Sequence, residues 1–348
     1  MDAKYRKYLW ISIGLSLAVL LAVVIFTFDE NTISALQNLD YKYILLAFAL
    51  HITALFFWGL RILVLSKSLG YKVPFSHCIN MAAAGQLLAA ITPSSIGGEP
   101  VRIHELYKAD IPLAESTAIV LVERILEAVL LVIGVIIGMV MFSIMFGERG
   151  IPHQIMILAW CGIVFFAFLL VILILMMRKH EFIKKIGLKI TGFITKKFSE
   201  ERQNKINNAV SDGIDNFYAA IAHFSGKAKL GLFTAMFLSL CFWTCEYLIA
   251  SVIMVGLGYN ANILLSIIFQ LIIAIILMIP LTPGSAGFAE VCYFGFYSII
   301  LPSSVIGIFI VLQRLIMYYS NLVIGFIASF IIVKREASSK KVIEDEKI

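Results

Sequence analysis

The sequence predicts an all-α polytopic membrane protein, with six full spans plus two re-entrant helical hairpins arranged as an inverted repeat. Of its 348 residues, 61% are hydrophobic and only 14% are charged, and the mean hydropathy is +0.95. Because water-soluble domains usually carry about 25% charged residues, a soluble globule is excluded. The distribution of lysine and arginine predicts the orientation of the spans, and two similar polar turns far apart in the chain predict the repeat.

Six stretches are apolar over the length that a helix needs to cross the hydrocarbon core, about 20 residues. They are residues 8–27, 43–64, 115–145, 154–177, 229–255 and 304–333. The first follows three basic residues, as a secretory signal would, but it is long and ends without a small-residue cleavage site. An uncleaved membrane anchor is therefore predicted.

Basic residues cluster before the first span, between the fourth and fifth spans, and after the sixth. The clusters comprise Lys4, Arg6 and Lys7; Arg178, Lys179, Lys184, Lys185, Lys189, Lys196, Lys197, Arg202 and Lys205; and Lys334, Arg335, Lys340 and Lys341. Cytoplasmic connections carry an excess of lysine and arginine, so both termini are predicted to be cytoplasmic. The net charge of +6 reflects this sidedness and does not indicate a nucleic-acid partner. The predicted location is the cell membrane, crossed several times.

Residues 65–114 and 263–300 each begin and end on one side of the membrane in this topology. The apolar part of the first, Cys78 to Ile91, would be about 21 Å long as a helix, which is short for a span. Each segment is predicted to enter the membrane and turn back at a polar sequence, Thr92-Pro-Ser-Ser-Ile-Gly-Gly98 or Thr282-Pro-Gly-Ser-Ala-Gly287. A pair of short full crossings would preserve the same topology and is the alternative.

The two turns are related by one constant offset along the chain. The matching pairs are Thr92 and Thr282, Pro93 and Pro283, Ser95 and Ser285, Gly97 and Gly287, and Arg124 and Arg314. The first copy begins with a span that runs inward and the second with one that runs outward, so the copies are inverted. Many transporters are built in this way, with the binding site where the broken helices meet near the midplane.

A single integral membrane domain is predicted over residues 1–335, followed by a charged cytoplasmic tail at 336–348. Repeat A covers about 43–145 and repeat B about 229–333, and the cytoplasmic connection covers 178–228. Apolar residues of this connection recur at helical spacing, with lysines expected on the opposite face: Phe182, Ile183, Ile186, Ile190, Phe193, Ile194 and Phe198. Such a helix lies flat on an anionic leaflet. A solvated helix that packs on a partner protein is the alternative.

Two arginines are predicted deep within spans, Arg124 and Arg314, each about 14–15 Å from the start of its span at helical rise. A charge at that depth costs a few kcal/mol or more, so such residues face the bundle interior and take partners. Arg124 can pair with Glu127 on its own helix, which would simply neutralise it. Arg314 has no such neighbour, so its partner must come from another element or from a ligand.

Three carboxylates are the candidate protein partners: Glu99 and Glu290, just past the two turns, and Glu246, midway through the fifth span. Glu246 is also a candidate for ion coupling, since a buried carboxyl group has a raised pKa; a structural hydrogen bond is the equal alternative. His51 and Gln270 are interpreted as hydrogen-bonding residues between helices.

We hypothesise that Arg124 and Arg314 converge with the half-helix starts after Gly97-Gly98 and Gly287 to receive an anionic head group. The guanidinium fork fits phosphate in a bidentate manner. Free backbone amides at the start of a helix also favour anions.

No cofactor and no metal are expected. The five cysteines have no spacing typical of zinc or redox sites, and the chain contains no phosphate-binding glycine loop, metal-binding His pair or Ser-His set. An enzymatic function is left open but is less favoured, because no catalytic set is visible. Membrane lipids with anionic head groups are the expected partners, while a homo-oligomer or a complex with a lipid-modifying enzyme is left open.

Three motifs resemble one family: Thr92-Pro-Ser-Ser-Ile-Gly-Gly-Glu-Pro-Val-Arg102, then Glu123-Arg124, and Thr282-Pro-Gly-Ser-Ala-Gly-Phe-Ala-Glu290. They resemble the flippase-like family typified by the transmembrane domain of lysylphosphatidylglycerol synthase, also called multiple peptide resistance factor. The resemblance covers roughly residues 5–335. It implies movement of an anionic, aminoacylated or polyprenyl-linked lipid between leaflets. By motif position it implicates Gly97, Gly98, Glu99, Arg102, Glu123, Arg124, Gly287, Glu290 and Arg314.

The chain departs from that family in one respect, because only the short segment 334–348 follows the last predicted span and the soluble aminoacyl-transfer domain is not expected. Transfer of lysine to lipid is therefore not supported. Two alternatives to a flippase remain. One is a membrane-embedded enzyme or accessory subunit of lipid-linked sugar metabolism, with Glu99 and Arg102 as chemical groups; the other is an ion-coupled small-solute transporter.

Overall fold

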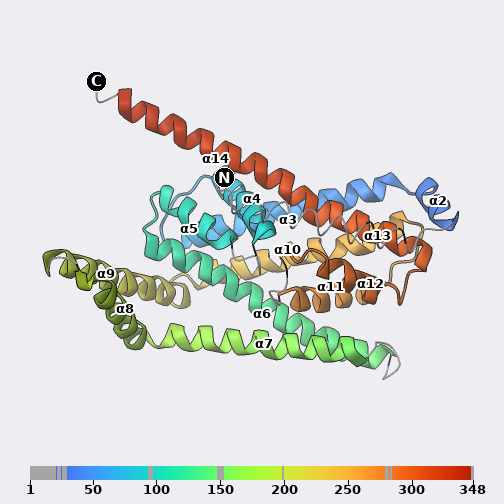
Figure 1. Cartoon of the computed structure of the whole chain (residues 1–348), viewed down its shortest axis with the longest axis horizontal. Helices are drawn as coiled ribbons and strands as arrows, with labels where there is room; N and C mark the ends of the chain where they lie inside the picture. Colours follow the sequence, from blue (N-terminus) through green and yellow to red (C-terminus); the bar gives the residue numbers. More distant parts are fainter. Residues whose placement is uncertain are drawn as a thin grey trace.

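The computed structural model describes residues 21, 25, 30–92, 97–146, 153–197, 200–278, 282 and 284–345. These residues are helical apart from short connections, and no strand occurs among them (Figure 1). The elements are α2 (Glu30–Gln37), α3 (Tyr41–Ser68), α4 (Phe75–Ile91), α5 (Gly98–Lys108), α6 (Leu113–Phe146), α7 (His153–Arg178), α8 (His180–Ile194), η2 (Thr195–Lys197), α9 (Glu200–Ser225), α10 (Lys229–Gly256), α11 (Ile263–Leu277), α12 (Phe288–Tyr297), α13 (Ser303–Arg314), the π-helical η3 (Leu315–Tyr319) and α14 (Ser320–Asp345).

Four described helical segments are long and apolar enough to cross a membrane: Tyr41–Ser68, Leu113–Ile144, Lys229–Gly256 and Ser303–Arg335. They coincide with four of the predicted spans. The predicted span 154–177 falls in α7, which holds a shorter apolar stretch at Trp160–Ile172. The predicted span 8–27 lies outside the described residues, except for Leu21 and Ile25.

The order of helices in the first half recurs in the second at a nearly constant distance along the chain. The starts of α3 and α10 are separated by the same number of positions as the starts of α4 and α11. The separation between α5 and α12 equals that between α6 and α13, and it is only two positions longer. Thus each half has a long, a short and a shorter helix, followed by a long helical segment, which is α6 in the first half and begins with α13 in the second.

The ends of α3 and α10 also share their backbone conformation. After α3, Gly70 has φ +92° and Tyr71 N donates to Ser66 O at 3.1 Å. After α10, Gly258 has φ +83° and Tyr259 N donates to Met254 O at 3.0 Å. Both are Schellman ends, in which a glycine adopts the left-handed conformation that lets the last carbonyls find donors. The repeated Leu-Gly-Tyr sequence therefore folds in the same way twice.

Helices α3 and α10 pack side by side and run in opposite directions. The start of α3 lies against the end of α10, because Asp40 N donates to Gly256 O at 2.9 Å. The end of α3 lies against the start of α10, where the backbone of Gly231 approaches Ser68. Two corresponding helices are thus antiparallel neighbours.

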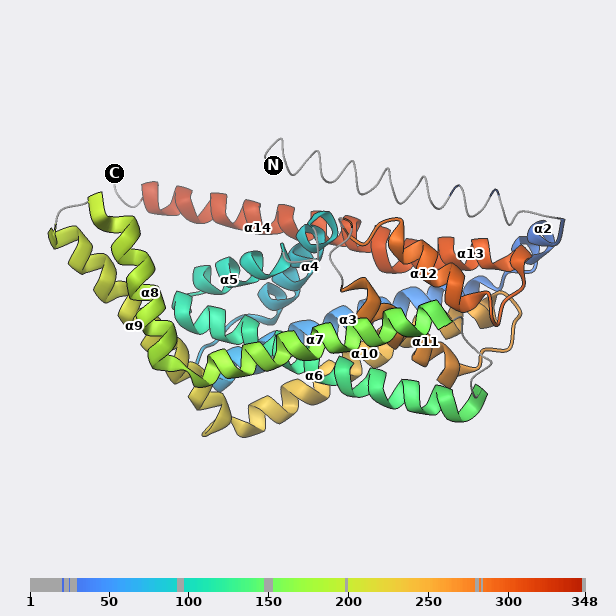
Figure 2. The same ribbon diagram turned by 60° about the horizontal axis from the view of Figure 1, so that its bottom comes forward.

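Each pair of short helices forms an antiparallel hairpin. In the first, the start of α4 lies beside the end of α5, with His77 Nε2 3.2 Å from Glu105 O. In the second, the start of α11 lies beside the end of α12, with Ser266 Oγ 3.0 Å from the Tyr297 hydroxyl. The α4–α5 hairpin lies toward the end of the molecule that carries α8 and α9, and the α11–α12 hairpin toward the end that carries α2 (Figures 1 and 2).

The tips of the two hairpins meet in the middle of the molecule. Gly284 N lies 3.5 Å from Thr92 O, and the Gly284 backbone approaches Ala90 O closely. Each hairpin also packs against a long helix of the other half. Helix α4 of the first half packs along α14 of the second, and α11 of the second half packs along α6 of the first. The interface of the two halves therefore runs through the centre of the fold.

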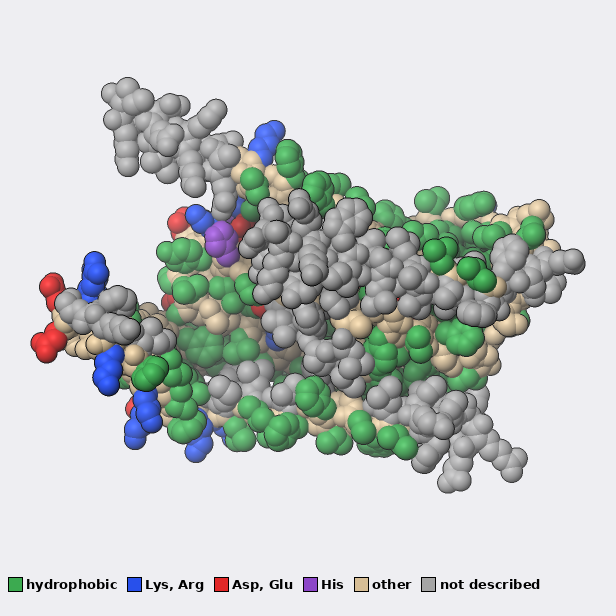
Figure 3. Space-filling view, viewed as in Figure 1, with side chains coloured by type: hydrophobic (Ala, Val, Ile, Leu, Met, Phe, Trp, Pro, Cys, Tyr) green, Lys and Arg blue, Asp and Glu red, His purple; other side chains and the backbone are tan. Residues whose placement is uncertain are grey.

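Helices α8 and α9 form an arm at one end of the long helices (Figure 2). Lys184 Nζ donates to Asp215 at 2.6 Å across the arm, and this hydrogen bond lowers the pKa of the Asp215 carboxyl group. The outward face of α8 is apolar and exposed, with Phe182, Ile186, Ile190 and Phe193. On the face shown in Figure 3, exposed basic side chains gather at this end of the molecule.

One expectation about α8 is wrong in detail, because its lysines do not all lie opposite the apolar row. Lys185 is three residues from Phe182 and Lys189 is four from Phe193, so both exposed lysines border that row. Ile183 is half-buried and Gly187 lies against Ile214 of α9. The apolar residues are therefore divided between the packing of the arm and an exposed face.

Candidate functional site

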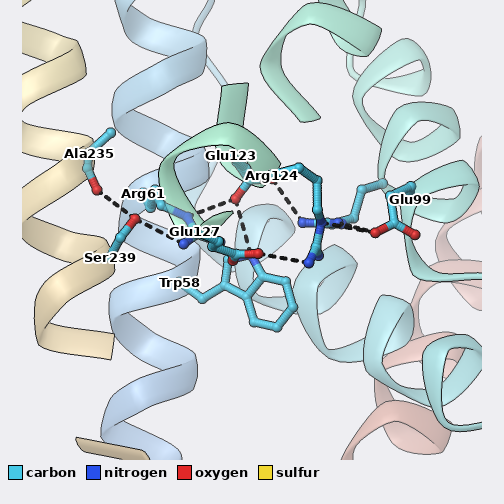
Figure 4. A network of polar contacts seen from close by, with 9 residues as sticks. Trp58, Arg61, Glu99, Glu123, Arg124, Glu127, Ala235 and Ser239 are labelled. Atoms are coloured by element: carbon cyan, nitrogen blue, oxygen red, sulfur yellow. Dashed lines mark hydrogen bonds and ion pairs between the residues drawn. The ribbon is translucent and has the colours of Figure 1, made fainter. Parts of the chain in front are cut away.

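A buried ion network joins α3, α5 and α6. Arg61 of α3 is 0% exposed and pairs with Glu123 at 2.9 Å and Glu127 at 2.5 Å, both from α6. Arg102 of α5, 1% exposed, donates to the other oxygen of Glu123 at 2.9 Å. Arg61 also donates to Ser239 of α10 at 3.0 Å. Figure 4 shows Arg61 between the two glutamates and Ser239.

Helical spacing explains why these groups meet. Glu123 and Glu127 are four residues apart, so they share one face of α6. Trp58 and Arg61 are three apart on α3, and the Trp58 Nε1–H group donates to Glu123 at 3.1 Å. The guanidinium carbons of Arg61 and Arg102 lie 5.6 and 5.2 Å from the Trp58 ring centroid, within cation–π range. Each buried charge therefore has partners.

Arg124 connects the buried network to a more exposed ion pair with Glu99. Its Nε lies 2.9 Å from Glu99 of α5, and its Nη1 donates to Glu127 at 2.7 Å. The side chains of Arg124 and Glu99 are 37% and 23% exposed, whereas Glu123 is fully buried. The Arg124–Glu127 pair along one helix is thus present, but it is joined by a second carboxylate from the hairpin.

The second half contains a corresponding pair. Arg314 Nε lies 3.0 Å from Glu290 of α12, and its guanidinium carbon lies 4.2 Å from the Tyr318 ring centroid. Of the two sources predicted for a partner of Arg314, another element or a ligand, the structure shows the first. Arg314 directly precedes η3, where the helix widens to π geometry, a distortion that is frequent at functional sites.

Arg124 and Arg314 line the same cavity, of about 330 Å³, at the meeting point of the two hairpins. Glu99, Glu127, Tyr293, Tyr318 and Asn321 also contribute to its wall. A smaller cavity of about 120 Å³ adjoins it, lined by Trp58, Arg102, Arg124 and Trp243 among others. The geometry thus offers one polar chamber to which both halves contribute an arginine.

A third polar cluster joins α3, α10 and α14 beside this chamber. His51 Nδ1 lies 2.8 Å from Glu246, and His51 Nε2 lies 3.0 Å from Asn321, which lines the large cavity. Glu246 is 6% exposed and is not itself part of the cavity wall. The structural hydrogen bond, which was the equal alternative to ion coupling for Glu246, is present. Gln270 likewise bonds between helices, donating to the Tyr297 hydroxyl at 2.8 Å.

The glycines of the motifs lie at the tips of the hairpins. Gly97 and Gly98 begin α5, and a Cβ on buried Gly98 would be 2.9 Å from Gly85 O, so this site needs close backbone approach. Gly287 has φ +79° and directly precedes α12. Pro93, Ser94, Ser95, Ile96 and Pro283 lie outside the described residues. None of the three glycines lines the larger cavity, whereas Gly98 lines the smaller one.

Two groups with central roles escaped the sequence-based prediction. Arg61 lies near the end of the span 43–64, so it is not among the arginines predicted to lie deep within spans. Trp58, three residues earlier, looked like an ordinary apolar residue. The sequence feature that indicates a buried Arg61 is its position in an otherwise apolar run, between Gly59-Leu60 and Ile62-Leu63. Arg102, by contrast, was predicted for the site but is turned toward Glu123 in the network.

Among the described residues, no group of three or more His, Cys, Asp and Glu side chains is arranged to hold a metal ion.

An all-helical integral membrane protein, with two hairpins that meet at an ion-paired chamber, is the class that the fold and site define. The chain belongs to the lysylphosphatidylglycerol synthase TM region family, whose model matches residues 10–325. A UPF0104 membrane protein of Archaeoglobus fulgidus is 32% identical over 91% of this chain and 95% of its own length. UPF0104 membrane proteins of Methanocaldococcus jannaschii and Pyrococcus horikoshii are 28% and 24% identical, covering 94% and 92% of this chain and 95% of each relative.

Proposed function

We propose that this protein moves a lipid with an anionic head group between the two leaflets of the cell membrane. The observation that carries the proposal is the shared chamber, which Arg124 and Arg314 line from corresponding positions of the two halves. Guanidinium groups bind phosphate in a bidentate manner and are favoured where they are partly desolvated. Membership of this family is consistent with a lipid-related role in the membrane.

An inverted repeat with re-entrant hairpins supports alternating access to this chamber. Its support comes from the constant helix offsets, the matching Schellman ends, the antiparallel packing of α3 and α10, and the exchange of α4 and α11 between halves. Corresponding helices that run antiparallel are what a two-fold axis in the membrane plane produces. Hairpins whose tips meet at the centre give irregular backbone a buried place within the bilayer.

The chamber's charges suggest how a head group would bind. Arg61, Arg102 and Glu123 are almost fully buried, so they form a fixed support. Arg124 and Glu99 are the more exposed pair, and they face the cavity. A phosphate that reaches Arg124 therefore competes with Glu99, while the fixed support keeps the α5–α6 contact in place. In the second half, Arg314 offers its guanidinium group against the Tyr318 ring.

This arrangement favours a carrier over the enzyme alternative. Arg102 is 1% exposed and is held by Glu123, and it does not line the large cavity, so Glu99 and Arg102 do not form a free reacting pair. The solute-carrier alternative would predict a chamber without an apolar extension toward lipid.

Replacing Arg124 or Arg314 by glutamine is expected to slow lipid translocation by about tenfold or more, because a hydrogen bond to a charged group is worth roughly 1.5–3 kcal/mol. Purified protein in liposomes would be assayed by the accessibility of fluorescent lipids with anionic, zwitterionic and polyprenyl phosphate head groups. Arg178→Gln, at the exposed end of α7, is the matched control and should leave the rate unchanged. The proposal fails if the parent accelerates no lipid, or if the variants of both cavity arginines match the parent.

The proposed topology has six crossings and both termini in the cytoplasm, with α8 lying on the cytoplasmic leaflet. In liposomes, Phe193→Cys is then expected to react at least several-fold more slowly with a membrane-impermeant maleimide than Glu181→Cys, although the Phe193 side chain is 80% exposed in the isolated chain. The reason is that an interfacial helix buries its apolar face among the lipid chains. Glu181, whose side chain is 90% exposed, is the control on the same helix. Equal rates, above the labelling of the parent, would contradict the interfacial position of α8.

A further inference from the structure

An apolar groove lies between α6, α10 and α11 and belongs to none of the polar contacts described above. Its volume is about 170 Å³. The wall includes Leu131 and Gly134 of α6, Leu240, Thr244 and Tyr247 of α10, and Leu271 of α11. Leu240 is 51% exposed and Thr244 is exposed, so the groove opens on the outer surface of two helices that are long and apolar enough to span the membrane. In a bilayer this surface faces lipid chains.

Trp243 connects the groove to the polar chamber. The same side chain lines the groove, the small cavity with Arg102 and the large cavity with Arg124 and Arg314. Its ring stacks on Tyr247, with centroids 5.2 Å apart and an interplanar angle of 25°. The indole therefore lies between the charged groups of the chamber and the hydrocarbon wall of the groove.

The indole also carries an unused donor. Trp243 Nε1 is buried and has no hydrogen-bond partner within the described part of the chain. A buried indole N–H group normally finds a partner, because leaving it without one costs about 1–3 kcal/mol. A ligand oxygen at the boundary between chamber and groove would supply that partner.

We propose that this groove holds the hydrocarbon chain of the lipid whose head group occupies the arginine-lined chamber, with the Trp243 indole at the boundary between them. The inference rests on the proposed function and adds to it the second half of the ligand. The occupant follows from the order of surfaces along the path: guanidinium groups, an N–H donor, then apolar side chains. This is the order of phosphate, ester oxygen and chain in a phospholipid. A solute without a chain would leave the groove without a role.

Filling the groove tests the inference through transport. Thr244→Trp is expected to slow movement of a long-chain lipid at least fivefold, while a short-chain lipid with the same head group keeps its rate. Phe237→Trp is the matched control, because Phe237 is 63% exposed on α10, seven residues and about two helical turns away, and does not line the groove. Equal rates for Thr244→Trp and the control, or equal slowing of both lipids, would overturn the inference.

Occupancy of the groove can be measured without transport. Phosphatidylglycerol brominated near its ester bonds should quench the fluorescence of Trp243, taken as the difference between the parent and Trp243→Phe. Quenching should exceed that by phosphatidylcholine brominated at the same carbons. Thr244→Trp, measured as the difference from Thr244→Trp combined with Trp243→Phe, should remove this excess. Equal quenching by both lipids means ordinary boundary lipid and overturns the inference. Because quenching needs no translocation, a parent that moves no lipid would contradict the proposed function while the groove is still tested.

Discussion

Replacing Arg61 by methionine is expected to lower the free energy of unfolding by about 3–5 kcal/mol, the magnitude seen when one partner of a buried ion pair is removed. Arg61 is 0% exposed and holds Glu123 and Glu127 together, with Ser239 as a further acceptor. Without it, each of the two carboxylates loses one of its guanidinium partners inside the bundle. Unfolding by sodium dodecyl sulfate in mixed micelles, followed by circular dichroism, would measure the loss.

Two further variants separate the buried charge from the loss of side-chain volume. Glu123→Gln combined with Arg61→Met should recover part of the stability, because a neutral amide replaces the carboxylate left behind. Arg124→Met should cost clearly less than Arg61→Met, since the Arg124 side chain is 37% exposed. If Arg61→Met and Arg124→Met are equally mild, then the network does not hold α3 against α6 in the way described.

The contrast between these arginines shows what sequence can predict about this site. Arg124 and Arg314 were found because each interrupts an apolar span at depth and the two recur at a fixed offset. Their carboxylate partners followed from the motifs, although Glu99 and Glu290 differ by one position from that offset. This difference of one position does not prevent the ion pairs, because a long side chain reaches partners within one helical turn.

Arg61 shows where the prediction fails. Depth along one helix is readable from the chain, but a contact between α3 and α6 depends on how two helices cross. By sequence Arg61 lies near the end of its span, whereas packing places it in the interior. The same limit applies to Trp243, because only the packing of the helices shows that it lines the groove and both cavities. It applies also to Lys185 and Lys189, whose position relative to the apolar row depends on which face of α8 meets α9.

The helices are more predictable than the site, because their order and spacing recur in the two halves of the chain. A turn seen once in sequence is weak evidence, yet Leu-Gly-Tyr occurs after both α3 and α10, and each copy adopts the same Schellman end. The short apolar lengths in 65–114 and 263–300 predict short helices, and the structure has the pairs α4–α5 and α11–α12 there. How α4 and α11 exchange between the halves could not be derived, since it is decided by packing across the centre.

Replacing Gly284 by alanine is expected to abolish most translocation and to lower stability by about 2 kcal/mol or more, since left-handed backbone alone costs a residue with a Cβ roughly 1–2 kcal/mol. Gly284 has φ +57°, and a Cβ there would lie 2.3 Å from Ala90 O and 3.0 Å from the Tyr318 ring. Ala90 and Tyr318 both line the chamber, so the clash falls where the tips of the two hairpins meet. Unfolding and liposome translocation would both be measured.

Gly258→Ala provides the matched control for that substitution. Gly258 has φ +83°, but a Cβ there would meet no atom within 4 Å, so this variant changes the backbone preference without a clash. The difference between the two variants therefore measures the contact between the hairpin tips. Gly258→Ala should lose some stability and keep its translocation rate, whereas Gly284→Ala should lose both. If the two variants translocate lipid equally well, then the contact of the tips does not form part of the lipid path.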